Sequence, residues 1–334
     1  MSFMSKASRA ITQKLDSHPG HRRLFAQGEL TVGLIMPLET HPGKPAPTMA
    51  DHASMAVKAD QLGFAALWLR DVPFYDPDYG DVAQVFDPIP YIGYLTALTQ
   101  NIVLGTTGIV LPLREPLSLA KQIASLDQLS TGRVILGISS GDRPADYPLF
   151  GVDFDSRGAR FRESYTVFKT VTEQSFPSFD SQFGRSNGGF DLIPKPFTGR
   201  TPTLAVGQAQ QSLEWIATNL DGLIRAAPDP FYISSVAKQW QDAVARHADY
   251  GAFKPLGLGM FLDLFENAEA PMRRIPGGFR SGRNALIEFF QTAKVAGIGH
   301  IALNPKVSHR PYADVMEELA EEVLPLFPSH GSRR

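Results

Sequence analysis

Hydrophobic and polar positions along the chain follow two alternating patterns. Short runs rich in β-branched and other apolar residues are followed by longer segments in which apolar residues recur every three or four positions. The first pattern is typical of buried parallel strands, and the second of helices that pack one face on a sheet. Strands are predicted at 30–36, 65–69, 102–107, 133–139, 202–207, 221–226, 256–262 and 300–304. Helices are predicted at 49–62, 89–99, 117–129, 160–173, 211–219, 233–247, 284–296 and 312–324.

Eight strands with eight crossover helices predict an α/β fold of the (β/α)8 TIM-barrel type. We expect a single barrel domain at 30–328, preceded by an N-terminal extension at 1–29 and followed by a tail at 329–334. Residues 176–200, after the fourth strand, and 266–282, after the seventh, are too rich in Gly, Pro and polar residues for helices. We read both as insertions, the first with a small hairpin. Because barrel active sites lie at the C-terminal ends of the strands, we expect these insertions to cover one.

Composition narrows the class of ligand. Lys and Arg number 32 against 34 for Asp and Glu, and no block of like charge occurs, so neither a nucleic acid nor an anionic membrane is indicated as a partner. A small-molecule substrate is the default. The chain has no cysteine, which excludes disulfides and thiolate chemistry, and its histidines form no metal-binding motif. With no signal-type segment or long apolar run, we expect a soluble, cytoplasmic protein.

Small residues recur where the predicted strands end. They occur at 105–108 after the third strand, at 139–141 after the fourth and at 207–209 after the fifth. Small residues admit a flat or bulky ligand to the backbone, so these positions suggest the floor of a cofactor site. The helix that begins near Gln210 or Gln211 would offer its free N–H groups, and Ser212 its hydroxyl, to a phosphate. An ordinary helix cap is the alternative interpretation of this start.

Three of these features lie within motifs that match a known family. LGTTGIVLPLREPLSLAKQIASLDQLSTGRVILGISSGDRPADYPLFGVDF, followed by RGARFRE, resembles the core signature of the bacterial luciferase-like flavin monooxygenases. ADQLGFAALWLRD, GQAQQSLEWIA and GIGHIALNP extend the resemblance, which runs from about Leu30 to Phe327. It implies a (β/α)8 barrel that holds a flavin, or in one branch a deazaflavin, at the C-terminal mouth.

The resemblance also implies roles for individual residues. It places a non-prolyl cis peptide bond between Thr107 and Gly108, beneath the flavin ring, and an acidic residue close to the ring at Asp71. A solvated loop acid or a partner for Arg70 is the alternative for Asp71. The other matched cofactor-binding positions are Ser139, Ser140 and Gly141 along the cofactor, and Gly207, Gln208, Ala209 and Ser212 toward its phosphate.

The chain departs from the luciferases at two matched positions. Luciferases have a histidine directly after the acidic residue, where this chain has Val72, so long-chain aldehyde chemistry is not indicated. A phosphate-binding arginine corresponds to Ser140, and Arg143 could supply that charge instead. His41, after the first strand, is a candidate to face substrate, with an exposed loop histidine as the alternative. The catalytic candidates are therefore Asp71, His41 and Arg143.

Three functions remain open. In the first, a separate flavin reductase supplies reduced FMN, which reacts with O2 to oxygenate a small organic substrate; no GxGxxG follows a predicted strand, so no internal nicotinamide site is indicated. In the second, the protein is a deazaflavin-dependent dehydrogenase or reductase whose cofactor tail meets Arg143, Arg273, Arg274 and Arg280. In the third, it is a flavin-binding subunit without turnover, which Val72 makes conceivable. By analogy with the family we expect a homodimer.

Overall fold

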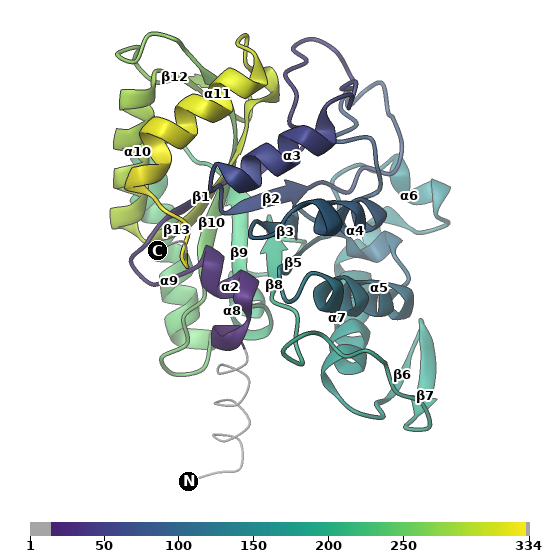
Figure 1. Ribbon diagram of the computed structural model, residues 1–334. Helices are drawn as coiled ribbons and strands as arrows, with labels where there is room; N and C mark the ends of the chain where they lie inside the picture. Colours follow the sequence, from purple (N-terminus) through teal and green to yellow (C-terminus); the bar gives the residue numbers. More distant parts are fainter. Residues whose placement is uncertain (1–14, 332–334) are drawn as a thin grey trace.

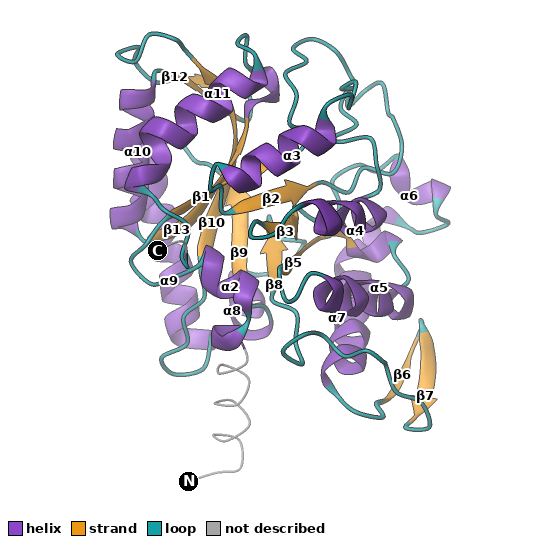
Figure 2. Ribbon diagram, viewed as in Figure 1, coloured by secondary structure: helices purple, strands orange, loops and turns teal. Residues whose placement is uncertain are grey.

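Eight parallel strands close into a barrel in the computed structural model, which describes residues 15–331 (Figures 1 and 2). The barrel strands are β1 (Thr31–Ile35), β2 (Ala66–Leu69), β3 (Val103–Thr106), β5 (Val134–Ser139), β8 (Thr203–Val206), β9 (Gly222–Ala226), β10 (Leu256–Leu264) and β13 (Ile298–Asn304). Each pairs with the next in this order, and β13 pairs with β1 to close the ring. All eight predicted strands and the predicted TIM-barrel fold are confirmed.

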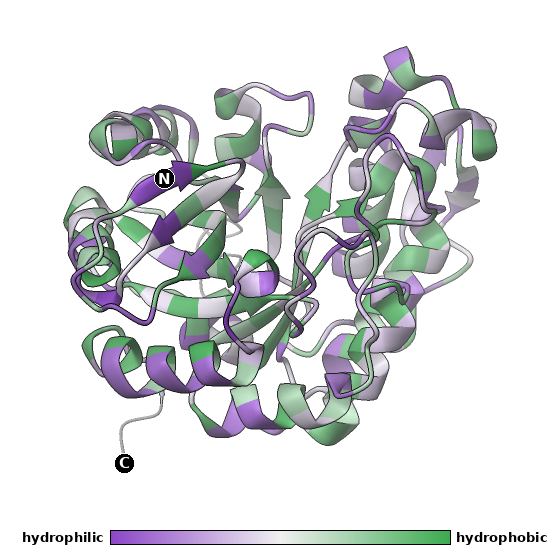
Figure 3. Ribbon diagram, turned by 90° about the horizontal axis from the view of Figure 1, so that it is seen from above, coloured by the Kyte–Doolittle hydropathy of each residue, from purple (hydrophilic) through white to green (hydrophobic). Residues whose placement is uncertain are grey.

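Helices surround the barrel, as the view from above shows (Figure 3). The crossover helices are α3 (His52–Gln61), α4 (Pro88–Leu98), α5 (Pro116–Leu129), α7 (Arg157–Glu173), α8 (Leu213–Asn219), α9 (Ile233–His247), α10 (Arg283–Ala296) and α11 (Tyr312–Glu318). α4 and α5 each begin with proline, preceded by a carboxylate cap from Asp87 or Glu115, a combination that favours a helix start. The last predicted helix ends early, because a π turn (Leu319–Val323) and a 3-10 turn (Leu324–Leu326) follow α11.

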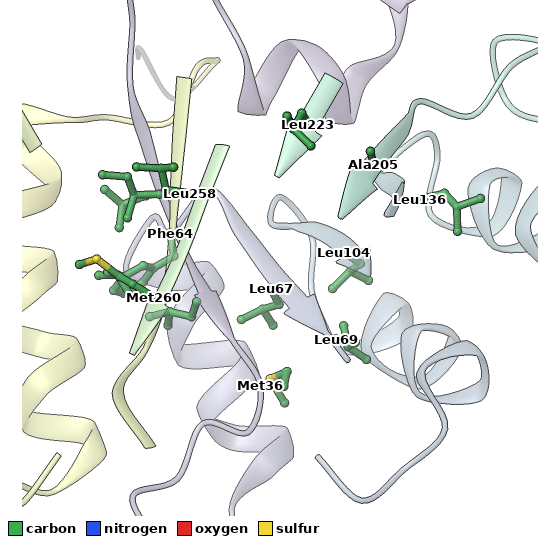
Figure 4. Close-up of a cluster of buried hydrophobic side chains, with 14 of the residues drawn as sticks. Met36, Phe64, Leu67, Leu69, Leu104, Leu136, Ala205, Leu223, Leu258 and Met260 are labelled. Atoms are coloured by element: carbon green, nitrogen blue, oxygen red, sulfur yellow. The ribbon is translucent and has the colours of Figure 1, made fainter. Parts of the chain in front are cut away.

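Two hydrophobic layers stabilise this arrangement. The outer layer lies between strands and helices and includes Leu67, Leu104 and Leu136 (Figure 4). The inner layer fills the barrel itself and includes Trp68 and residues from six other barrel strands. The indole of Trp68 occupies the space beside Gly105, where an added Cβ would lie 2.3 Å from the ring. Leu24 and Phe25, at the end of the short helix α2 (Pro19–Leu24), belong to the inner layer, so part of the predicted N-terminal extension packs against the barrel.

A chain of hydrogen bonds crosses the barrel interior. The indole N–H of Trp68 donates to His300 Nε2 at 2.9 Å, which leaves the ring proton of His300 on Nδ1, 2.8 Å from Thr31 Oγ1. The Thr31 hydroxyl in turn donates to the Leu24 carbonyl at 2.8 Å. His300 is fully buried, and this burial lowers its pKa to about 3. His300 is therefore a core histidine whose two ring nitrogens both have hydrogen-bond partners.

The two insertions lie at opposite ends of the barrel. Residues 176–200 contain the predicted hairpin, β6 (Ser178–Ser181) and β7 (Gly184–Asn187), but they connect the end of α7 to the start of β8. Lys195 donates to carbonyls at the C-terminal end of α7, at the N-terminal ends of the strands. The expectation that this insertion covers the barrel mouth is therefore wrong, because a segment that follows a crossover helix returns to the opposite rim (Figure 1).

The second insertion forms β11 (Arg273–Ile275) and β12 (Gly278–Ser281), with β12 paired to the end of β10 at the C-terminal rim. The remaining short elements, most of them on the same rim, are β4 (Ile109–Val110), α6 (Asp146–Leu149) and 3-10 turns at Leu111–Leu113, Phe154–Ser156, Pro230–Tyr232 and Pro305–Val307.

Candidate functional site

A cavity with a volume of about 600 Å³, which we call the large cavity, opens at the C-terminal ends of β2, β3, β5 and β8. Its lining residues are 70–72, Thr107, Gly108, Val110, Leu113, 139–143, Asp146, Tyr147 and 206–211. The structure therefore brings together nearly all of the predicted cofactor residues. Neither insertion contributes to this lining.

Backbone atoms form the floor of the cavity. The peptide bond between Thr107 and Gly108 is cis, as the resemblance implied. An added Cβ at Gly108 would lie 2.8 Å from Val206 Cγ2 and 3.1 Å from the Gly137 carbonyl oxygen, so no larger residue fits without displacing the floor. The Ser139 hydroxyl lies 3.3 Å from the Gly108 carbonyl oxygen and can donate to it. Among the described residues, buried Thr107 Oγ1 has no hydrogen-bond partner, which leaves one polar group of the floor unsatisfied.

A strained turn after β8 forms one wall. Gly207, Ala209 and Gln210 have φ of 62°, 48° and 57°, in the left-handed region that L residues other than Asn and Asp rarely adopt. The Gln211 side chain holds the turn by donating to the carbonyl oxygens of Ala209 at 3.0 Å and Gly158 at 2.9 Å. Backbone strain of this kind is common where a turn is shaped to receive a ligand.

Ser212 lies just beyond this turn and outside the cavity lining. Its hydroxyl accepts a hydrogen bond from the Trp215 N–H at 3.2 Å and so caps α8. The cap is the alternative that the sequence left open for this helix start. A phosphate role for Ser212 stays a prediction.

Asp71 is held rigidly in the wall of the cavity. Its carboxylate accepts hydrogen bonds from the Val110 N–H at 2.9 Å and from Nε and Nη2 of Arg114, and its side chain is 4% exposed. Arg114 also bonds Asp87 at 2.7 Å. Both alternatives considered for Asp71 are wrong: it is not solvated, and Arg70 pairs with Asp81 instead. By accepting the Val110 N–H, Asp71 holds the backbone of β4, which follows Gly108.

Three cationic side chains, those of Arg70, Arg143 and Lys306, contact Asp81. Its carboxylate accepts from Arg70 and from Lys306 Nζ, the latter at 2.8 Å. Burial opposes ionisation of Asp81, but Arg70 and Lys306 outweigh it and hold the pKa of this carboxyl well below its usual range. Arg143 Nη2 donates to the Asp81 carbonyl oxygen at 2.8 Å, and the guanidinium carbon lies 4.7 Å from the centre of the Tyr79 ring.

His41 does not line the large cavity. It is 6% exposed, so the alternative of an exposed loop histidine is wrong. Its Nδ1 donates to the Glu39 carbonyl oxygen at 3.2 Å, and its backbone N–H donates to that of Lys306 at 3.0 Å. Burial lowers its pKa. These contacts tie the loop after β1 to the end of β13, and a catalytic role for His41 stays a prediction.

Sequence reasoning missed the segment between β2 and α4, residues 72–87, which we call the mouth loop. Tyr79 donates to the Asp142 carbonyl oxygen, and Phe74 packs 6.1 Å from Phe150 between ring centres. The loop therefore borders the cavity that the insertions were expected to cover. Its run of acidic and aromatic residues, VPFYDPDYGD, was the available signal. The roles of Lys306 and Arg114 left no local signal, since their partners are distant in sequence.

Comparison with known proteins agrees with this geometry. The family model for luciferase-like monooxygenases matches residues 30–273. The chain belongs to the luciferase-like monooxygenase family. A curated relative, 4-hydroxyprotoasukamycin monooxygenase from Streptomyces nodosus subsp. asukaensis, is 28% identical over 202 residues, covering 58% of this chain and 52% of its own. The chain spans about half the length of the curated relatives it matches.

Solved structures share the fold of this luciferase-like protein. An F420-dependent secondary alcohol dehydrogenase, in complex with an F420–acetone adduct, has a TM-score of 0.70 at 17% identity and covers 88% of this chain and 98% of its own. The oxygenating constituent of 3,6-diketocamphane monooxygenase from Pseudomonas putida, in complex with FMN, has a TM-score of 0.68 at 15% identity and covers 89% and 98%.

Two features are absent from residues 15–331 of the luciferase-like chain. No helix there is long and apolar enough to cross a membrane. No group of three or more His, Asp or Glu side chains in this part of the chain is placed to hold a metal ion.

Proposed function

We propose that this protein is a flavin-dependent monooxygenase that uses reduced FMN and O2 on a small organic substrate. The observation that carries the proposal is the cavity at the barrel mouth, whose lining includes Thr107 and Gly108 and the small residues at 139–141 and 207–209. A volume of about 600 Å³ lies within the range of pockets that enclose ligands of cofactor size. The similarity to 4-hydroxyprotoasukamycin monooxygenase supports the oxygenation chemistry.

The residues of the cavity fit a flavin. A flat ring needs a floor without side chains, which Gly108 provides because any Cβ there meets Val206. A flavin ring also carries polar atoms along one edge, and the unpartnered Thr107 Oγ1 offers both a donor and an acceptor. The phosphate end would be held by the turn at 207–211, which lines the cavity and contains left-handed residues of the kind that form anion-binding concavities.

When bound, FMN would supply the oxygen and electron chemistry. The chain's own groups bind and orient. Asp71, held by Arg114, accepts a hydrogen bond from the Val110 N–H. The Ser139 hydroxyl can donate to the Gly108 carbonyl oxygen. Val72 lines the cavity, and its apolar side chain helps to exclude water from it. Unlike a histidine at this position, it cannot transfer protons. We further propose that a separate flavin reductase supplies the reduced cofactor and that the protein is a homodimer.

A deazaflavin-dependent dehydrogenase is the second candidate, which the likeness to the F420-dependent alcohol dehydrogenase favours. The structure weakens one argument for it. Arg273 and Arg274 lie on the strand β11, and Arg280 pairs with Asp263 at 2.6 Å beside a separate, smaller cavity. Of the arginines named for the anionic cofactor tail, only Arg143 lines the large cavity. FMN is therefore our first choice.

The test is a pair of titrations followed by turnover. FMN binding is measured by quenching of flavin fluorescence, and F420 binding by its own fluorescence, on the same protein. Oxygen uptake with reduced FMN is then measured with and without candidate substrates, and products are identified by mass spectrometry. The proposal predicts FMN binding and a substrate-dependent oxygenated product. Binding of F420 alone would replace it with the dehydrogenase, and binding without any product would favour the subunit without turnover.

A further inference from the structure

The cation cluster at the mouth, formed by Arg70, Arg143 and Lys306, is only partly neutralised. Asp81 is the one carboxylate within ion-pair distance of any of the three among the described residues. Arg143 is 7% exposed and forms no ion pair in this part of the chain, and its Nη1 has no hydrogen-bond partner there. A buried guanidinium without a carboxylate partner is costly, so Arg143 is a candidate place for a ligand that supplies the missing negative charge.

Two nearby acids do not fill this role. Asp142 and Asp146 line the same cavity, and Arg143 lowers the pKa of Asp146 against the larger raising effect of burial. Neither carboxylate comes within 4 Å of Arg143 in the described structure, since no ion pair joins them. Lys306 is already committed to Asp81, and Arg70 and Arg143 both lower its pKa further after burial. The cluster therefore has capacity for another negative charge.

Arg143 lies at the mouth loop, away from the turn at 207–211 where we place the phosphate of the cofactor. Arg143 follows β5 but reaches to the mouth loop, where it contacts the Asp81 carbonyl oxygen and the Tyr79 ring. Its electrostatic neighbour Lys306 follows β13. The turn at 207–211 follows β8, on the other side of β5 from the mouth loop. A charge at Arg143 is thus available to a second molecule that lies beside the cofactor.

We propose that Arg143, with Arg70 beside it, binds the carboxylate of an anionic organic substrate. The proposal rests on the proposed function and names its substrate class. A planar guanidinium matches a carboxylate because two parallel N–H···O bonds can form. Both arginines line the cavity, so the carboxylate is held at its edge while the rest of the substrate extends over the floor. Asp81 competes for the same cations.

Benzoate is the probe, with benzamide as its neutral match, and binding is measured by isothermal titration calorimetry with and without FMN. The proposal predicts that wild type binds benzoate and not benzamide. Arg143→Gln should weaken benzoate binding by about tenfold to a hundredfold, the size expected for a lost charged hydrogen bond. Arg143→Lys should recover part of this loss. Asp81→Asn should tighten binding by about twofold to fivefold, because a competing negative charge is removed.

A gain of affinity in Asp81→Asn cannot come from misfolding, so this variant keeps the test decisive. Lys238→Gln, on the exposed face of α9, is the matched surface control and should bind as wild type does. Unchanged benzoate binding in Arg143→Gln would overturn the proposal. It would also be overturned if neither wild type nor Asp81→Asn bound benzoate at concentrations up to about 10 mM.

The same variants separate a substrate anion from the cofactor phosphate. FMN and riboflavin, which lacks the phosphate, are titrated into wild type and Arg143→Gln. The proposal predicts that the variant changes neither affinity by more than about twofold. Loss of FMN binding with riboflavin binding kept would overturn it, because Arg143 would then serve the phosphate. If no flavin binds while benzoate binding still depends on Arg143, the proposed function fails and the anion site stands.

Discussion

Acid should destabilise this protein through His300, and replacing that histidine should remove a defined part of the effect. His300 accepts from the Trp68 indole on Nε2 and uses Nδ1 toward Thr31, so the neutral ring is fully bonded. A second proton would have to sit on Nε2, where it would meet the indole N–H. The folded protein therefore keeps His300 neutral, and burial lowers the pKa of this histidine to about 3 from an ordinary value of 6.5.

The sign and size of the effect follow from linkage. Between pH 6.5 and 3 the unfolded chain takes up a proton on this residue that the folded chain does not, so stability is complete above pH 6.5 and falls as the pH falls. At pH 5, which is 1.5 units below the ordinary value, the loss is about 2 kcal/mol. His21, whose pKa burial lowers to about 4, adds a similar loss, also about 2 kcal/mol at pH 5.

Urea unfolding followed by far-UV circular dichroism at pH 7.5 and pH 5 measures this difference. In His300→Gln the loss of stability on acidification should be smaller than in wild type by about 2 kcal/mol, whatever its stability at pH 7.5. His247→Gln, at the exposed end of α9, is the matched control and should keep the full wild-type loss. An equal loss in wild type and His300→Gln would refute the reasoning, because the folded protein would then take up a proton at His300 as readily as the unfolded chain does.

Three further substitutions test the site and its supports. Gly108→Val should weaken FMN binding by at least about tenfold, measured by fluorescence quenching, because its Cβ enters the floor; wild-type affinity would show that the ring does not rest there. Arg114→Ala should cost about 3 kcal/mol in urea unfolding by leaving the buried carboxylate of Asp71 unpaired, and Arg114→Lys should cost less; no change would show that the pair is not structural. Gly105→Ala should cost about 1–3 kcal/mol in the same assay, because its Cβ overlaps the Trp68 ring, and a neutral result would contradict the packing of the barrel interior.

The fold could be predicted from the sequence because each βα unit carries its own local pattern. The segment 133–139 is an apolar run between a turn and a row of small residues, and it forms β5 over almost the same residues. Local signals also located the floor, since an added Cβ would lie 2.8 Å from Val206 Cγ2 at Gly108 and 2.8 Å from Val110 Cγ1 at Gly141. The cis bond followed from the family resemblance rather than from any physical signal in the residues.

The ion pairs beside the cavity could not be predicted, because they join residues that are distant in sequence. Arg114 and Asp71 are 43 residues apart, and Lys306 reaches Asp81 from the far end of the chain. Nothing near Asp71 in the sequence distinguishes Arg114 from Arg70 as its partner. The insertion at 176–200 was assigned to the wrong rim because composition shows that a segment is irregular, while only its place after a helix shows which rim it meets.

The cofactor site is the central claim, and a crystal structure of the protein grown with FMN tests it most directly. The account predicts the flavin ring on the backbone of Thr107 and Gly108, with its phosphate at the turn 207–211. Density for FMN at any other place, or side chains filling this cavity at saturating FMN, would contradict it.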